Sequence, residues 1–280
     1  MHAYTVVDVF TSTPLQGNQV AVFDHGSDLS DDVMQRAARE LNLSETVFLL
    51  PAQAGADARV RIFTPSAELP FAGHPLIGTA FVLGARWSAS LVRLETGVGV
   101  IPVALRHEAG EPVFGEMDQP IPTAEPFPRE RELLTAIGVE RSELPIEAYL
   151  NGPRHVYVAL GGEQAVAALR PDITALEALG DGLGINCFAG AGGHFKTRMF
   201  APGLGVPEDP ATGSAAGPLA VHLARHGWTS YGEQIEISQG AEIGRPSLLH
   251  ARVEGGEDRV ERVVVGGSAV IVAHGEYRLD

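Results

Sequence analysis

The chain has 280 residues, 45% of them hydrophobic, and a formal net charge of −15 at pH 7, which suits two domains of ordinary size. The negative charge argues against nucleic acid or an anionic membrane as a partner, and no apolar run reaches the roughly 20 residues of a membrane span. The single cysteine, Cys187, excludes an intrachain disulfide and a cysteine-based zinc cage, and without a recognisable signal peptide we expect a cytoplasmic protein.

The first 50 residues predict two strands, a helix and a third strand. Residues 4–10 and 20–23 are β-branched and apolar, which is typical of strands. Ser30 is expected to cap a helix that ends near Asn42, because apolar side chains follow it at helical spacing. Residues 43–50 then alternate as a strand does.

Glu45 shares the apolar face of that third strand with Leu43, Val47 and Leu49. If its side chain is buried, desolvation raises its pKa and makes it a general acid/base near neutral pH. If the strand begins in solvent, Glu45 is an ordinary exposed carboxylate. The spacing alone favours this second interpretation, because most carboxylates are exposed.

One sequence motif occurs twice. Residues 61–65 and 198–202 both read Arg-x-Phe-x-Pro, and each is followed by a loop and by a glycine at the start of an apolar helix, Gly73 in one copy and Gly213 in the other. Such a repeat predicts two similar domains. If the domains face each other, two helix N-termini converge on one cleft, where unpaired N–H groups and helix dipoles favour a ligand carboxylate.

The two helices of this repeat are expected to be buried. The first, over 74–83, is apolar on nearly every side, with Pro75 in its first turn and Gly84 as its end. In the second copy Pro218 lies early and Gly227 is the expected end. Short β-rich segments surround both helices, at 91–94, 99–105, 155–160, 235–238, 248–253, 262–265 and 270–273. Each half is therefore predicted to be a sheet curled around a central helix.

A stretch with three prolines, residues 117–126, is predicted to link the halves. This places an N-terminal domain over 1–118 and a C-terminal domain over 119–267, with the active site in the cleft between them. A final strand within 268–280 is a candidate to return to the first domain. Amphipathic helices are predicted at 129–137 and 164–169.

Polar side chains occur at the expected N-termini of both helices, which we call the helix mouths. His74 at a helix start should have a lowered pKa, and it is either a capping residue or a functional group. Asp209 and Ser214 are each ordinary caps when taken singly, but capping does not require polar side chains at both mouths. His222 and His226 have the i, i+4 spacing that metals use. No third ligand is evident nearby, so we interpret them as satisfied or exposed histidines.

Six segments carry a resemblance that runs from the first strand to the last. They are residues 43–45, 68–75, 117–120, 151–156, 185–192 and 211–220. In these segments the chain resembles the PhzF family of phenazine biosynthesis. The Gly-His-Pro and Thr-Gly-Ser sequences mark the wider superfamily, whereas Gly-Pro-Arg-His and Ile-Asn-Cys-Phe-Ala-Gly-Ala-Gly are closer to the phenazine enzymes themselves.

The resemblance implies an α+β, diaminopimelate-epimerase-like fold of two pseudo-symmetric domains, each a β-barrel around a central helix, in a homodimer. It also implies isomerisation of trans-2,3-dihydro-3-hydroxyanthranilate to the aminoketone 6-amino-5-oxocyclohex-2-ene-1-carboxylate, without cofactor or metal. Glu45 would take a proton from C3 of the ring and return it to C1. The unstable product could pass directly to a later phenazine-pathway enzyme.

The remaining site residues follow from the same resemblance. His74, Asp209 and Ser214 would bind and orient the substrate, and Gly73 and Gly213 would supply backbone N–H groups near its carboxylate. Related epimerases carry a cysteine at each helix mouth, so His74 and Ser214 exclude a two-thiol racemase. Two alternatives stay open: an isomerase or epimerase of the same fold for another small amino or hydroxy acid, and a non-catalytic carboxylate-binding protein.

Overall fold

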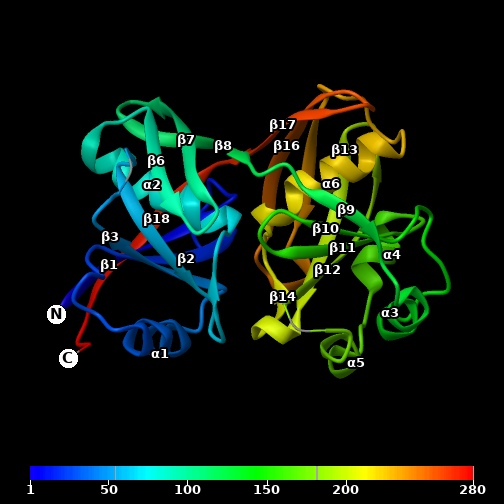
Figure 1. Cartoon of the computed structure of the whole chain (residues 1–280), viewed down its shortest axis with the longest axis horizontal. Coiled ribbons are helices and arrows are strands. Elements are labelled where there is room, and N and C mark those ends of the chain that lie inside the picture. Colours follow the sequence, from blue (N-terminus) through cyan, green and yellow to red (C-terminus); the bar gives the residue numbers. More distant parts are fainter. Residues whose placement is uncertain (54, 181, 280) are drawn as a thin grey trace.

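The computed structural model describes residues 1–53, 55–180 and 182–279. Two halves lie side by side, and strands in each surround one helix (Figure 1). These helices are α2 (Gly73–Trp87) and α6 (Gly213–Arg225), the two that the sequence repeat predicts. The chain termini lie close together at the edge of the first half (Figure 1).

The first half is built from an antiparallel sheet with two parallel crossovers. β1 pairs with β2, β2 runs parallel to β3, β3 pairs with β4, and β4 runs parallel to β6, which continues through β7 to β8. The short β5 pairs with β4, and α1 connects β2 to β3. The bounds are β1 (His2–Val9), β2 (Asn18–Phe23), α1 (Asp31–Leu41), β3 (Glu45–Leu50), β4 (Ala58–Phe63), β5 (Glu68–Leu69), β6 (Leu91–Thr96), β7 (Gly99–Glu108) and β8 (Glu111–Gln119).

The second half repeats these pairings strand for strand. β10 pairs with β11, β11 runs parallel to β12, β12 pairs with β13, and β13 runs parallel to β15, which continues through β16 to β17. The bounds are α3 (Glu130–Ile137), β10 (Glu147–Leu150), β11 (Arg154–Ala159), α4 (Glu163–Ala168), α5 (Ile173–Glu177), β12 (Leu183–Ala191), β13 (His194–Ala201), β14 (Val206–Asp209), β15 (Gln234–Gln239), β16 (Ser247–Gly255) and β17 (Val260–Gly267), with 3-10 turns η1 (Pro202–Leu204) and η2 (Ala241–Ile243).

The last strand of each repeat crosses to the other half. β9 (Thr123–Pro126) follows the first repeat and pairs with β10, whereas β18 (Ala269–Tyr277) follows the second and pairs with β1. β8 and β17 also pair with each other and join the two halves. The candidate strand within 268–280 thus does return to the first half. The residue-level domain boundaries, at 118/119 and 267/268, stay a prediction.

Both central helices are enclosed by their sheets. Every residue of α2 from Gly73 to Gly84 is buried, as is every residue of α6 from Gly213 to Ala224. The burial follows from the apolar sequence, because a helix without a polar face has no side to offer to water.

The predicted end of the first helix at Gly84 is wrong. α2 continues to Trp87 and ends at Ser88, which has a φ of +52°. Gly84 serves close packing instead, because a Cβ added there would lie 2.2 Å from Leu105 Cδ1. In the second copy α6 ends at Arg225, close to the expected Gly227.

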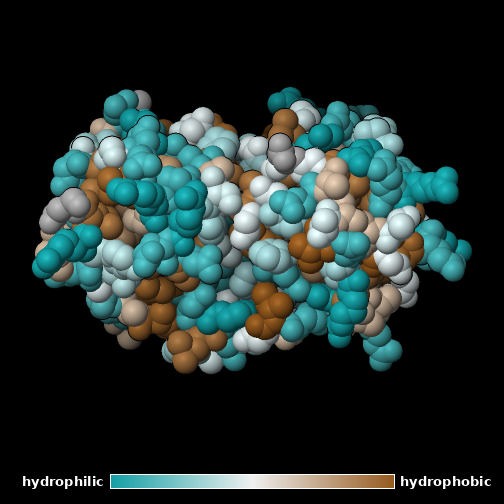
Figure 2. Space-filling view, turned by 90° about the horizontal axis from the view of Figure 1, so that it is seen from below, coloured by the Kyte–Doolittle hydropathy of each residue, from teal (hydrophilic) through white to brown (hydrophobic). Residues whose placement is uncertain are grey.

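The surface is of mixed hydropathy. On the face shown in Figure 2, hydrophilic residues cover much of both halves and hydrophobic residues gather in separate patches. None of the helices among the described residues is both long and apolar enough to span a bilayer.

Candidate active site

The N-termini of α2 and α6 meet at a pocket between the two halves. A Cβ added to Gly73 would lie 2.5 Å from the carbonyl carbon of Gly213, so the two backbones touch and only glycine fits there. The pocket encloses about 420 Å³ not filled by atoms, part of it open to solvent. It is lined by Glu45, Thr64, Leu69, Ala72, Gly73, His74, Pro153, His155, Met199, Ala201, Leu204, Val206, Asp209, Thr212, Gly213 and Ser214. All six residues that the sequence selected therefore lie in one place.

Glu45, the first residue of β3, carries a sheltered carboxyl group. Its side chain is 14% exposed, and Oε2 lies 3.3 Å from His74 Nε2 but has no hydrogen-bond partner among the described residues. Burial, and then the negative charge of Asp209, raise the pKa of this carboxyl well above its usual value. The interpretation of Glu45 as an ordinary exposed carboxylate is wrong, because the strand begins beneath the helix mouths rather than in solvent.

His74 is held as a neutral imidazole. Burial lowers its pKa to about 4, although Asp209 opposes this effect. Its Nδ1 lies 3.3 Å from Asn18 Nδ2, an amide nitrogen that cannot accept, so an Nδ1–H would find no acceptor there. The proton then resides on Nε2, which faces the Gln19 carbonyl at 3.3 Å and the Glu45 carboxyl.

Asp209, the last residue of β14, is surrounded by donors. Its Oδ1 accepts from Ser44 Oγ (2.8 Å) and Asn18 Nδ2 (2.9 Å), and its Oδ2 accepts from Thr212 Oγ1 (2.5 Å). These three donors hold the buried carboxylate in place. Sequence reasoning missed them as site residues. Ser44 and Thr212 lie inside segments that carry the family resemblance, whereas nothing local marks Asn18.

Ser214, the second residue of α6, pairs with a histidine that the sequence did not select. His155 Nε2 lies 3.0 Å from Ser214 Oγ, and the ring is 2% exposed. Burial lowers the pKa of His155 to about 3. The available signal was the Gly-Pro-Arg-His segment, in which this histidine is the last residue.

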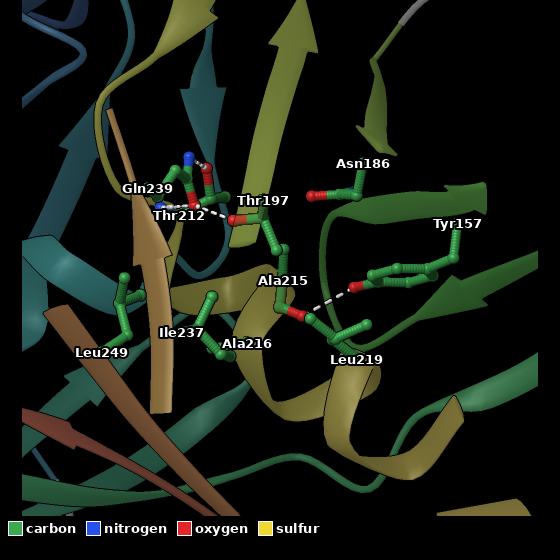
Figure 3. Close-up of a pocket in the computed structure, with 10 residues that line it drawn as sticks. All are labelled: Tyr157, Asn186, Thr197, Thr212, Ala215, Ala216, Leu219, Ile237, Gln239 and Leu249. Atoms are coloured by element: carbon green, nitrogen blue, oxygen red, sulfur yellow. Dashed lines mark hydrogen bonds between the residues drawn. The ribbon is translucent and has the colours of Figure 1, made fainter. Parts of the chain in front are cut away.

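Side chains from the sheet fix the first turn of α6. Pro218 has no N–H for the Ser214 carbonyl, and Asn151 Nδ2 donates to that oxygen instead (2.9 Å). Tyr157 donates to the Ala215 carbonyl at 2.7 Å. Figure 3 shows this bond beside a second, smaller cavity, where Gln239, Thr197 and Thr212 also hydrogen-bond to one another.

The repeated Arg-x-Phe motif holds the segments that lead to the helix mouths. Arg61 donates to both carboxylate oxygens of Glu68 (2.7 and 2.6 Å), and Arg198 donates to both of Glu208 (2.8 Å each). In both copies the guanidinium lies 5.1 Å from the ring of the phenylalanine two residues later. Glu208, the partner of Arg198, directly precedes Asp209 in the chain.

His222 and His226 lie beside Glu147 on β10, whose carboxylate could serve as a third metal ligand. The sequence did not indicate this residue. Its Oε2 lies 3.2 Å from His222 Nδ1 and 3.1 Å from His226 Nε2. The same oxygen accepts from Arg225 (3.1 Å) and Tyr149 (2.8 Å). The guanidinium of Arg225 already neutralises this carboxylate. We therefore interpret the cluster as two histidines that hydrogen-bond to Glu147 rather than as a metal centre.

The fold resembles that of a known structural class. A hydroxyproline epimerase from Agrobacterium vitis has a TM-score of 0.70 at 13% identity, covering 98% of this chain and 91% of that chain. At this identity the likeness concerns the fold alone. It agrees with the diaminopimelate-epimerase-like class of paired barrels that the sequence implies.

The family follows from closer relatives. The family model described as phenazine biosynthesis-like protein, PhzC-PhzF, matches residues 7–275, so the chain belongs to this family. It is 57% identical over 279 residues to the trans-2,3-dihydro-3-hydroxyanthranilate isomerase of Pseudomonas aeruginosa, with all of both chains covered. A PhzF-family phenazine biosynthesis protein of Bacillus anthracis superposes with a TM-score of 0.83 at 26% identity, covering 99% of each chain.

Proposed function

We propose that the protein isomerises trans-2,3-dihydro-3-hydroxyanthranilate to 6-amino-5-oxocyclohex-2-ene-1-carboxylate in phenazine biosynthesis. The reaction removes a proton from C3 and adds one to C1, and the resulting enol tautomerises to the aminoketone, so the overall composition does not change. The observation that carries the proposal is the sheltered Glu45 carboxyl at the meeting point of two helix N-termini. The full-length similarity to the isomerase of Pseudomonas aeruginosa supplies the substrate.

The helix mouths suit the substrate carboxylate. The first N–H groups of an α-helix have no partner within the helix, and the positive dipole end attracts an anion. Gly73 and Gly213 leave these groups accessible, and the Ser214 hydroxyl lines the same pocket. The Asp209 carboxylate then provides a negative counterpart for the amino group on the neighbouring ring carbon.

Glu45 is suited to move the proton. Its raised pKa keeps the carboxyl a strong enough base, when ionised, to accept the C3 proton and an effective acid to return it to C1. His74 Nε2 lies 3.3 Å from Glu45 Oε2, and the neutral ring would orient the carboxylate during the transfer. Gly73, Gly213, Ser214 and Asp209 would hold the ring in place between the two positions.

A Glu45→Gln variant tests the role of the carboxyl. We expect turnover of the dihydro-hydroxyanthranilate to fall at least 10³-fold, because the amide cannot accept and return the proton as the carboxyl does, while binding of 2-aminobenzoate changes little. In deuterium oxide the product should take up solvent deuterium when the enol tautomerises, and also at C1 when the Glu45 carboxyl exchanges its proton before returning it. Glu40→Gln, which alters an exposed carboxylate at the end of α1, is the control and should keep full activity.

The outcomes separate the alternatives. Unchanged turnover in Glu45→Gln would contradict the assigned role. Deuterium exchange into another small amino or hydroxy acid, but not into this substrate, would indicate a different isomerase. Binding of 2-aminobenzoate without any exchange would indicate a carboxylate-binding protein.

We also infer that the enzyme is a cytoplasmic homodimer that needs no cofactor and hands its product to a later enzyme. The implied phenazine-pathway role supports these expectations, since an unstable aminoketone benefits from rapid use. Light scattering after size-exclusion chromatography, and activity after exhaustive chelation, test the dimer and the independence from metal.

A further inference from the structure

The strand pairings allow the two halves to be aligned residue by residue. Phe63 and Phe200 occupy the same place in the repeated Arg-x-Phe motif. On the neighbouring strand Phe63 pairs with Thr46, and Phe200 pairs with Ile185. Position 46 of β3 therefore corresponds to position 185 of β12.

One residue earlier, the two halves differ in their chemistry. The first half has Glu45, which pairs with Val20 of the parallel strand β2. The second half has Gly184, which pairs with His155 of the parallel strand β11. The pseudo-symmetry thus places His155 and Gly184 where the other half carries a small apolar residue and the acid.

The imidazole of His155 takes the space of the missing acid. A Cβ added to Gly184 would lie 2.7 Å from His155 Nδ1, so the glycine is required for the ring to fit. The ring lines the pocket, and its Nε2 contacts Ser214 Oγ at 3.0 Å. The second half therefore offers a fixed imidazole and a serine hydroxyl where a second acid would stand.

The direction of the hydrogen bonds follows from Asn186. Its Nδ2 donates to the Gly184 carbonyl (3.2 Å) and the Val156 carbonyl (3.4 Å), which fixes this nitrogen as a donor. It also lies 3.4 Å from His155 Nδ1, and because an amide nitrogen cannot accept, an Nδ1–H would face a group that offers it no acceptor. The proton of the neutral ring then lies on Nε2 and is donated to Ser214 Oγ. The Ser214 hydroxyl keeps its own proton for a ligand.

We propose that His155 is a positioning residue that makes Ser214 a dedicated hydrogen-bond donor. Together with the helix N–H groups in the same pocket, this donor favours a ligand group with two acceptor oxygens, a carboxylate, over a carboxamide, whose NH2 cannot accept. The inference rests on the proposed function, because it specifies the side chain that reads the substrate carboxylate. It assigns to the second half a role in selecting the substrate, while the first half carries the acid.

A double-mutant cycle in binding tests this role without requiring turnover. The probes are 2-aminobenzoate and 2-aminobenzamide, which differ only in the carboxyl group, and calorimetry measures both affinities. We expect the preference of the wild type for the carboxylate to fall roughly tenfold in His155→Leu, about the contribution of one hydrogen bond to a charged group. Ser214→Ala should show the same loss, and the double variant no further loss.

Two comparisons distinguish positioning from packing. A ring that merely fills space would lower both affinities alike, and its loss would add to that of Ser214→Ala. His155→Gln places an N–H near the position of Nε2 and should keep most of the preference, which also covers the case in which the leucine variant fails to fold.

The failures of the two proposals are distinguishable. A wild type without any preference for 2-aminobenzoate would overturn both the carboxylate seat and the inference. A preference that persists in His155→Leu, or additive effects in the double variant, would overturn the inference alone.

Discussion

The raised pKa of Glu45 has an energetic consequence besides catalysis. Burial and the Asp209 charge disfavour the ionised carboxylate in the folded protein, whereas the unfolded chain exposes it to water. The folded state therefore binds this proton more tightly than the unfolded state does. The associated stability is fully present below the unfolded pKa and is lost as the pH rises through the folded pKa.

Replacing the acid should stabilise the protein at neutral pH. Glu45→Gln removes the charge and hence the cost of ionising a buried group. As the pH rises above about 4.5, the free energy of unfolding of the variant should therefore increase relative to that of the wild type. The increase should be up to roughly 1.4 kcal/mol per pH unit until the folded pKa is reached. Urea unfolding at pH 5, 6 and 7 measures this difference. Glu40→Gln should show no such trend, and an equal trend in both variants would contradict the explanation.

At the scale of elements, glycines in the central helices are placed by packing rather than by chain termination. Gly84→Ala would favour helix formation by up to about 1 kcal/mol from propensity alone. The added methyl would lie 2.2 Å from Leu105 Cδ1, so we expect a net loss of about 1–3 kcal/mol from overpacking.

Thermal or urea unfolding of Gly84→Ala measures that loss. Gly256→Ala is the control, because a Cβ there has open space and the backbone needs no left-handed conformation. Its stability should stay within about 0.5 kcal/mol of the wild type. A Gly84→Ala variant more stable than the wild type would show that Leu105 moves aside at little cost.

The difference between local sequence signals and packing between distant residues explains what the sequence could predict. The all-apolar helices and the repeated motif predicted α2, α6 and their meeting point, because periodicity and repetition are local signals. The strands β12 and β13 were not predicted from the sequence, and Gly192 and Gly193 form the turn of the hairpin between them. A Cβ on Gly190 would lie 2.1 Å from the His194 carbonyl oxygen.

The candidate site shows a similar division. Glu45, His74 and Ser214 lie in recognisable segments, so the sequence and the family resemblance identified them. Asn18 and His155 act through partners at distant positions in the chain, Asn18 through Asp209 and His155 through Ser214. Only the folded sheets bring such pairs together. Nothing in the sequence around Asn18 marks it, whereas His155 ends the Gly-Pro-Arg-His segment.

At the scale of the whole molecule, the exchanged strands β9 and β18 and the β8–β17 pair tie the halves into one sheet. Neither half can complete its sheet without a strand from the other repeat. The pocket lies at this junction and takes Glu45 from one half and Ser214 from the other. We therefore expect the halves to unfold together.

Three buried histidines, one each on α2, β11 and α6, should make the whole fold sensitive to acid. Burial lowers the pKa of His74 to about 4, of His155 to about 3 and of His222 to about 4. The unfolded chain binds these protons near pH 6.5. Stability is therefore fully present above pH 6.5 and is lost as the pH falls toward the folded pKa values, by at most roughly 1.4 kcal/mol per unit for each histidine.

Urea unfolding between pH 7 and 5 should show this loss as a single transition that moves to lower denaturant. Glu45 opposes the trend, because its stability contribution grows as the pH falls toward 4.5, but three groups outweigh one. His155→Leu removes one of the three, so its stability should depend less steeply on pH even if its absolute value is lower. A wild-type stability that is constant or rises from pH 7 to 5, or an unchanged slope in His155→Leu, would show that these imidazoles are protonated in the folded protein.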